Sequence, residues 1–250
     1  MERFVLTDAQ WAKMKPHCLG KPTDPGRSGN DNRRFIEAVL WIARTGSPWR
    51  DLPDLFGNWN TAFKQYRDWV KADVFFRLFE ACSDEPDMEY AMVDATIVKV
   101  QRHGQGAKGG PQSQAIGRSK GGMTTKIPAL TDALGNLMRF VLLPGQRFDT
   151  VGVAALIDGV EFDGLIADKA FDSNHIIADL NERGAKIVIS QHPRRASPLP
   201  LDAELYKWRH FIENFFCKLK EFKRIAMRSD KTDQSFAAII HLCSAVINPR

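Results

Sequence analysis

The stretch Tyr206–Lys220, YKWRHFIENFFCKLK, decides how this chain folds and where its chemistry lies. Four polar residues stand at offsets 0, 3, 7 and 14 within it: Tyr206, Arg209, Glu213 and Lys220. At about 100° per helical residue they fall within an arc of about 60°. Large apolar residues project onto a separate, adjoining arc: Leu205, Trp208, Phe211, Ile212, Phe215, Phe216, Leu219 and Phe222. The stretch predicts one amphipathic helix with a core-facing side and, beside it, a stripe that holds a single carboxylate.

The composition is that of a globular protein with an anionic partner. The 250 residues are 44% hydrophobic and 26% charged, with a net charge of +5. The segment 101–126 contains five Lys or Arg and no acid, and the segment 207–231 contains eight basic residues and three acidic ones. Basic segments on both sides of a carboxylate site favour a polyphosphate substrate. Solvated charged faces are the alternative interpretation of the same segments.

Targeting and redox signals are absent from the sequence. No apolar region follows a basic start, and the longest apolar stretch, 236–247, is too short to span a bilayer. The four cysteines form no C-x-x-C pair, which argues against a zinc site or a disulfide framework. We therefore expect a cytoplasmic protein without a membrane partner, associated with the nucleoid of a bacterium when it acts.

Residues 1–85 read as a helical, DNA-binding region. A short helix and turn between Pro48 and Gly57, followed by a helix over residues 60–69, have the outline of a helix-turn-helix. Lys64 and Arg67 point outward from the second helix in this prediction and are candidate DNA contacts. Small helical bundles that never touch DNA share this outline and remain the alternative.

Residues 86–250 read as a mixed α/β region. Tyr90–Val98 and Asp163–Asp168 are strand-like, and residues 125–130 and 137–143 flank a hairpin turn. The glycine-rich, basic segment 103–122 contains Arg118 and Lys120, which are further candidate DNA contacts. A strand over residues 186–190, a loop over 192–200 and a last amphipathic helix over 234–247 complete the pattern.

Three acids occupy positions that suit a metal site. Asp94 lies inside an apolar strand, Asp168 ends another, and Glu213 lies on the amphipathic helix. An unpaired buried carboxylate is costly, so a bound cation would compensate it. Two aspartates and a glutamate can bracket two Mg²⁺ ions about 4 Å apart. Purely structural roles are the alternative for each acid taken alone, and an ordinary i, i+4 pair is the alternative for Arg209 with Glu213. Three other aspartates, in turns and next to helix starts, are interpreted as structural: Asp132, Asp149 and Asp172.

The chain closely resembles the DDE transposases of bacterial insertion sequences, namely the family numbered five and its neighbour numbered four. Those families carry Tyr, two residues, Arg, three residues, Glu, six residues and Lys, matched here by Tyr206–Lys220 without a gap. Their first aspartate lies in a segment similar to Val93–Val98, and their second in a segment similar to Ala167–Asp172.

The resemblance implies an RNase H-like catalytic domain over residues 86–250 behind a helical DNA-binding domain over residues 1–85. It implies Mg²⁺-dependent cleavage at terminal inverted repeats and transfer of the 3′-hydroxyl into target DNA, with Mn²⁺ expected to substitute. The implied catalytic and metal-binding residues are Asp94, Asp168 and Glu213, and the implied DNA contacts on the helix are Tyr206, Arg209 and Lys220. Because two DNA ends must meet, we expect a homodimer or a larger assembly.

Two other functions are compatible with the same residues. A structure-selective endonuclease with this metal site would cut DNA without joining it. A catalytically silent DNA-binding protein derived from such an element would do neither, although the intact set of three acids argues against it. Inverted repeats beside the gene would favour the transposase over the endonuclease.

Overall fold

The computed structural model describes residues 5–20, 24, 31–83, 85–107 and 109–248. The chain forms two compact units. One unit is mostly helical and comprises Met1–Asp84, Val100–Gly110 and Leu219–Arg250. The other contains most of the sheet and comprises Glu85–Lys99 and Pro111–Lys218. The proposed division into folding domains, 1–85 and 86–250, stays a prediction, because the helical unit also takes in two later segments.

The helical unit begins where the sequence carries helix-start signals. Its helices are α1 (Asp8–Met14), α2 (Asn32–Thr45), α3 (Trp59–Lys71), α4 (Val74–Cys82), α9 (Lys223–Ala226) and α10 (Asp233–Ile247). Thr7 caps α1 in a reciprocal capping box with Gln10, and Gly46 ends α2 in the left-handed conformation. The last helix, α10, packs on α4, so both ends of the chain contribute to this unit.

The expected short helix before α3 is instead a pair of 3₁₀ turns, Trp49–Asp51 and Asp54–Phe56. Pro53 stands between them, and a proline disfavours helical geometry at the residue before it while lacking an N–H of its own. The predicted longer helix that follows is confirmed as α3, with Lys64 and Arg67 exposed. A helix-turn-helix function for this segment stays a prediction.

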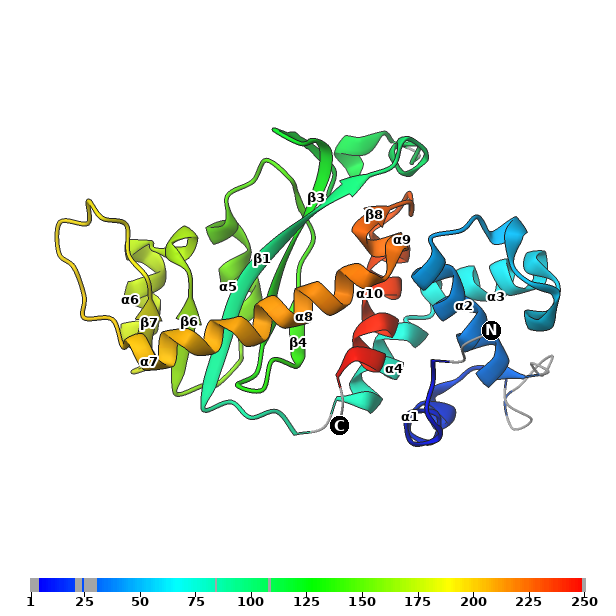
Figure 1. Ribbon diagram of the computed structural model, residues 1–250, viewed down its shortest axis with the longest axis horizontal. Helices are drawn as coiled ribbons and strands as arrows, with labels where there is room; N and C mark the ends of the chain where they lie inside the picture. The colour runs from blue at the N-terminus through cyan, green and yellow to red at the C-terminus, as the bar shows by residue number, and fades with distance from the viewer. Residues whose placement is uncertain (1–4, 21–23, 25–30, 84, 108, 249–250) are drawn as a thin grey trace. The chain divides into compact units, whose positions relative to one another are not determined.

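The other unit is built on a mixed sheet (Figure 1). Its strands are β1 (Tyr90–Val100), β2 (Gly117–Ser119), β3 (Gly122–Thr131), β4 (Leu137–Phe140), β5 (Leu143–Pro144), β6 (Gly164–Ala167) and β7 (Lys186–Ile189). The main order is β2-β3-β1-β6-β7, and β4 and β5 also pair with β3. The central strand β1 is antiparallel to β3 and parallel to β6, which is parallel to β7. A two-residue strand, β8 (Met227–Arg228), completes the list of strands.

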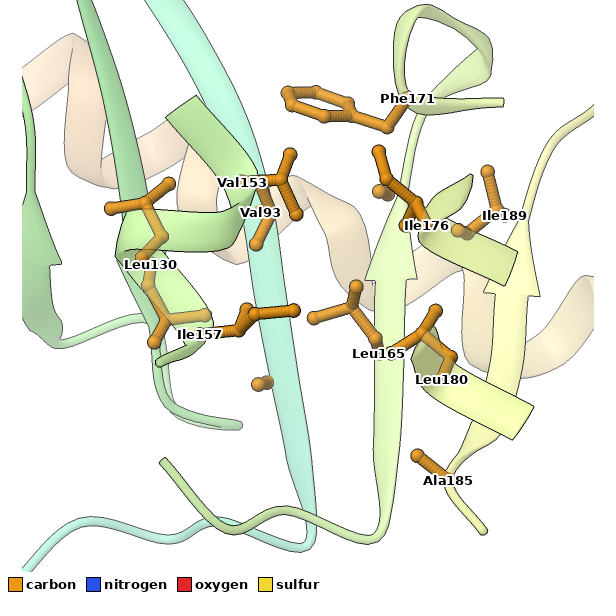
Figure 2. Close-up of a cluster of buried hydrophobic side chains, with 13 residues drawn as sticks. Val93, Leu130, Val153, Ile157, Leu165, Phe171, Ile176, Leu180, Ala185 and Ile189 are labelled. Atoms are coloured by element: carbon orange, nitrogen blue, oxygen red, sulfur yellow. The ribbon is translucent and has the colours of Figure 1, made fainter. Parts of the chain in front are cut away.

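Helices cover both faces of this sheet. On one face, α5 (Val153–Ile157) and α6 (Asn174–Glu182) bury a cluster with alternate residues of the strands. Figure 2 shows Val93 of β1 and Leu165 of β6 among the side chains of Ile157 and Ile176. On the other face, Trp208 packs edge-on against Tyr90, with ring centroids 5.7 Å apart. The mixed α/β class and the RNase H-like architecture behind a helical region are confirmed.

The stretch Tyr206–Lys220 lies on a nearly continuous helical path, as Figure 1 shows for α7 (Ala203–Tyr206) and α8 (His210–Glu221). Residues Lys207–Arg209 between them adopt a 3₁₀ turn. The expectation of one regular helix is therefore corrected, because a 3₁₀ turn winds the chain more tightly than an α-helix. Ile212, Phe215 and Leu219 are buried, as the apolar face predicts. No helix of the described residues is long and apolar enough to cross a membrane.

Candidate active site

Strand alternation places Asp94 on the face of the sheet opposite to α5 and α6. Ala91 and Val93 belong to the apolar cluster under those helices. Successive side chains of a strand point to opposite faces, so Asp94 faces the side that carries α7 and α8. Its carboxylate is 18% exposed, and its Oδ1 accepts the Ala95 N–H at 2.7 Å. A carboxylate in a strand interior is thus held at a partly buried position.

Asp168 stands beside Asp94 because of the register of two parallel strands. Val93 of β1 pairs with Ala167 of β6, and the two strands run in the same direction. The residue that follows Val93 is Asp94, and the residue that follows Ala167 is Asp168. Leu165 and Ala167 face the apolar cluster, which directs Asp168 toward the face of Asp94. Asp168 also begins the 3₁₀ turn Lys169–Phe171, where its Oδ1 accepts the Ala170 N–H at 2.8 Å. The structure therefore brings the two predicted aspartates together.

Glu213 joins this group through Arg209. The Arg209 guanidinium donates to Asp94 Oδ2 at 3.0 Å and also pairs with Glu213 in the first turn of α8. The family resemblance implies a DNA contact for Arg209, and the alternative is a helix pair with Glu213. In the structure its bonds go to two of the three acids, so a phosphate contact would require Arg209 to leave at least one of them.

The three carboxylates influence one another electrostatically. Burial raises the pKa of the Asp94 carboxyl above its usual value, and the nearby charges of Asp168 and Glu213 raise it further. The Ala95 N–H and Arg209 act in the opposite direction. Burial by itself lowers the pKa of Arg209, but Asp94 and Glu213 outweigh it, so the pKa rises. A cation placed among these acids would stabilise their charged forms.

The donor set suits a hard divalent cation. Within the described ranges of the chain, no three Asp, Glu, His or Cys side chains lie close enough together to hold a metal ion. The acids near Arg209 nevertheless offer only carboxylate oxygens, the ligands that Mg²⁺ prefers. Rotation of Glu213, which is 48% exposed, can change its distance from Asp94 without moving the backbone. The residues fit Mg²⁺ by chemistry, and their assignment as ligands stays a prediction.

The remaining predicted site residues have different environments. The Tyr206 hydroxyl donates to Ser190 Oγ at 3.1 Å, and its ring lies 5.9 Å from the Arg209 guanidinium carbon. Lys220 is exposed near the end of α8, in the helical unit. Arg118 and Lys120 are exposed at β2 and the turn after it. Their roles as DNA contacts stay predictions.

Asp172 makes structural contacts, but with partners that the sequence did not identify. It was interpreted as a residue beside a helix start, yet its side chain is only 4% exposed and forms an ion pair with Arg195. Asp172 lies four residues after Asp168 in the same short segment, and Arg195 follows Arg194 in a loop otherwise poor in charge. The sequence shows the position of Asp172 close to Asp168, but the spacing of the two residues predicts neither the burial of Asp172 nor its pairing with Arg195.

Comparisons with known proteins cover both parts of the chain. Residues 6–79 match a family model described as "Putative transposase of IS4/5 family", and residues 85–248 match one described as "Transposase DDE domain". The "Putative transposase for insertion sequence element IS6501" of Brucella ovis is 40% identical over 127 residues, which cover 50% of this chain and 98% of that relative.

Two further relatives have less informative names. The "Uncharacterized protein y4sN" of Sinorhizobium fredii is 32% identical over 117 residues, 47% of this chain and 86% of the relative. The "Insertion element IS402 uncharacterized 16.2 kDa protein" of Burkholderia cepacia is 31% identical over 144 residues, 52% of this chain and 95% of the relative. Each of the three relatives is covered over most of its own length.

Proposed function

The chain belongs to the insertion-sequence transposases that carry a DDE domain, and from this premise we propose that it cuts DNA at terminal inverted repeats and transfers the freed 3′-hydroxyl into target DNA. The proposed catalytic and metal-binding residues are Asp94, Asp168 and Glu213. The observation that carries the proposal is the register of β1 and β6, which sets Asp94 beside Asp168 on one face of the sheet.

Each acid has a defined part in this proposal. Asp94 is fixed by its strand and by the Ala95 N–H, and Asp168 by its own turn, so two of the three carboxylates are positioned before any substrate arrives. Glu213 is the adjustable member, because it is the most exposed and projects from a helix. Held by these carboxylates, Mg²⁺ would activate the attacking water or the 3′-hydroxyl of the DNA and would stabilise the charge on the leaving oxygen.

Cations of the chain would bind and orient the DNA. Without a metal, Arg209 pairs with both Asp94 and Glu213, and it would become available to a phosphate when another cation compensates those acids. Lys220, Arg118 and Lys120 are exposed cations suited to phosphate contacts that do not read sequence. DNA binding follows from the family, whereas the oligomer needed to hold two DNA ends is part of the proposal.

A cleavage assay with the full chain tests the function. The substrate is duplex DNA with the inverted repeats that flank the gene, incubated with Mg²⁺ or Mn²⁺. We expect Asp94→Asn, Asp168→Asn and Glu213→Gln each to slow cleavage by at least about 10³-fold, about 4 kcal/mol, while DNA binding is retained. Asp179→Asn, in a surface pair on α6, is the control and should cut normally.

The outcomes separate the possible functions. A variant of the three acids that cuts at the wild-type rate would remove that residue from the set of ligands. A wild-type protein that cuts but never joins the 3′ end to a target would be an endonuclease. Failure of the wild type to cut with either metal would contradict the proposed function.

A further inference from the structure

Hydrogen bonds join the two ends of the loop between β7 and α7, residues 191–199. Gln191 and Leu199 exchange two hydrogen bonds, from Gln191 Nε2 to the Leu199 carbonyl and from the Leu199 N–H to Gln191 Oε1, each 2.8 Å long. Immediately before the loop, Ser190 Oγ accepts a hydrogen bond from the Tyr206 hydroxyl. Both ends of the loop 191–199 are therefore fixed to each other and to α7.

Asp172 fastens the same loop from inside. Its carboxylate accepts the His192 N–H at 2.8 Å and pairs with Arg195. Arg195 also donates to Asn174 Oδ1 at 2.8 Å and to the Ser197 carbonyl at 3.1 Å. The Arg195 guanidinium thus bonds to groups within the protein and compensates the charge of Asp172. We therefore assign a structural role, and no contact with a ligand, to both residues.

The outer side of the loop presents polar groups to solvent. Arg194 is exposed, and its guanidinium has no acidic partner among the residues that the structure describes. The Arg194 N–H approaches Nδ1 of the exposed His192 at 3.3 Å, which leaves a neutral His192 with its proton on Nε2 as a donor. Asp172, Asn174, His192, Arg194 and Arg195 line a hollow of about 310 Å³.

The loop is held in place although it buries little of its own surface. Its residues His192–Arg194 and Ala196–Leu199 are exposed, so burial of apolar surface does not explain its order. Fixing a loop costs conformational entropy. The Asp172–Arg195 pair and the Gln191 amide offset that cost and hold the backbone on both sides of Arg194.

The loop lies next to the candidate active site through the sheet. The Ser190 N–H donates to the Ala167 carbonyl at 3.3 Å, so β6 and β7 end side by side. Asp168 follows the first of these strands directly, and the loop follows the second. Asp172 closes the turn after Asp168, where its N–H donates to the Lys169 carbonyl at 3.2 Å. One short turn thus carries both an acid of the active site and the anchor of the loop.

We infer that the loop 191–199 is a preformed phosphate-binding arm. Arg194, with the His192 ring beside it, contacts a backbone phosphate of the DNA strand held at the candidate active site. Asp172 is a positioning residue that acts through Arg195. This inference rests on the proposed function, since it takes the DNA of that same site as the ligand.

The first test removes the cation without touching its anchor. Binding of a fluorescein-labelled duplex with one terminal inverted repeat is measured with the full chain in EDTA, from about 50 to 200 mM salt. Arg194→Ala is expected to weaken binding severalfold and to reduce the slope of log K against log salt by about 0.9, the value for one phosphate contact. The control is Lys207→Ala, since Lys207 is exposed but already paired with Glu204. Equal effects of both substitutions, or an unchanged slope for Arg194→Ala, overturn the inference.

The second test releases the loop from either side of its ion pair. Asp172→Asn and Arg195→Gln are expected to speed amide hydrogen exchange in the loop severalfold and to weaken DNA binding. The loss from Asp172→Asn should be largely absent when Arg194 is already Ala, because both changes affect the same contact. Circular dichroism checks folding, and Arg195→Gln carries the test if Asp172→Asn does not fold. Asp179→Asn is the control for a surface ion pair. A loop that stays protected, or binding losses that simply add, contradicts the positioning role.

The two proposals fail in different ways. If the wild type cuts DNA and Arg194→Ala binds with the wild-type salt slope, the phosphate-binding arm is wrong and the proposed function stands. If Arg194→Ala weakens DNA binding but the wild type does not cut with any divalent metal, the proposed function is wrong and the arm remains a DNA-binding element.

Discussion

Arg209 donates a hydrogen bond to Asp94 at 3.0 Å, although 115 positions separate the two residues in the chain. The same guanidinium pairs with Glu213 one helical turn later. Since a guanidinium keeps its positive charge at any ordinary pH, Arg209 compensates two of the three acids that we propose as metal ligands. The stretch Tyr206–Lys220 therefore contributes both a carboxylate, Glu213, and a cation, Arg209, that offsets part of the negative charge of the site.

Replacing Arg209 tests this compensation. We expect Arg209→Gln to lower the stability of the metal-free protein by about 1–3 kcal/mol, because the partly buried Asp94 loses its cationic partner. Mg²⁺ should then raise the melting temperature more for the variant than for the wild type. Thermal denaturation in EDTA and in Mg²⁺ measures both effects, with Lys207→Gln as the control. Equal Mg²⁺-induced shifts would show that Arg209 does not substitute for a metal.

The Tyr206 hydroxyl offers a second test, because its bond to Ser190 competes with the predicted DNA contact. Tyr206→Phe and Ser190→Ala should each cost about 1 kcal/mol in urea denaturation. The double variant should lose no more than the larger single loss, since both changes remove one bond. Weaker DNA binding by Tyr206→Phe with normal binding by Ser190→Ala would instead favour a direct contact to DNA.

Gly135 fits the hairpin turn against α8. Its φ is +82°, and a Cβ there would lie 2.9 Å from Phe211 Cβ and 3.0 Å from the Phe211 carbonyl oxygen. We expect Gly135→Ala to cost more than the about 1 kcal/mol of left-handed strain alone. Gly159→Ala is a matched control, because its φ is +64° and no atom lies within 4 Å of a Cβ. Equal losses of unfolding free energy would mean that the contact with Phe211 is unimportant.

His241 makes the stability of the helical unit depend on pH. It packs against Phe76 and Phe79 of α4, and burial lowers its pKa from 6.5 to about 4. Between these values the unfolded chain binds the proton more readily, so stability is lost as the pH falls from 6.5 toward 4. The full effect is about 3 kcal/mol. Urea denaturation from pH 7 to 4 should show a smaller loss for His241→Leu than for the wild type. Parallel pH curves would contradict the assignment.

Much of the sheet was predictable from local patterns. The alternation around Asp94, the strand that ends on Asp168 and the hairpin between 130 and 137 follow from strand propensity and turn chemistry. Asp132 organises that hairpin turn as expected, accepting the Asn136 N–H at 2.8 Å. Periodicity did not reveal that α10 packs on α4, because it identifies an apolar face and not the element that covers it.

Side-chain partners within the site were harder to predict. The order of Asp94, Asp168 and Glu213 in strand, strand and helix was readable, since each lies in a distinct local pattern. The Arg209–Glu213 pair was readable as an i, i+4 contact. The bond from Arg209 to Asp94 and the pair of Asp172 with Arg195 were not, because each connects segments whose approach is set by tertiary packing. The 3₁₀ turn at Lys207–Arg209 was not predicted either, because the helical projection assumed the regular spacing of an α-helix.

The most direct test of the central claim is anomalous diffraction from crystals of the full chain grown with Mn²⁺. The account predicts an anomalous peak about 2 Å from carboxylate oxygens of both Asp94 and Asp168, with Glu213 turned toward it and Arg209 displaced. A peak at other residues, in a protein that cuts DNA with the same Mn²⁺, would contradict it.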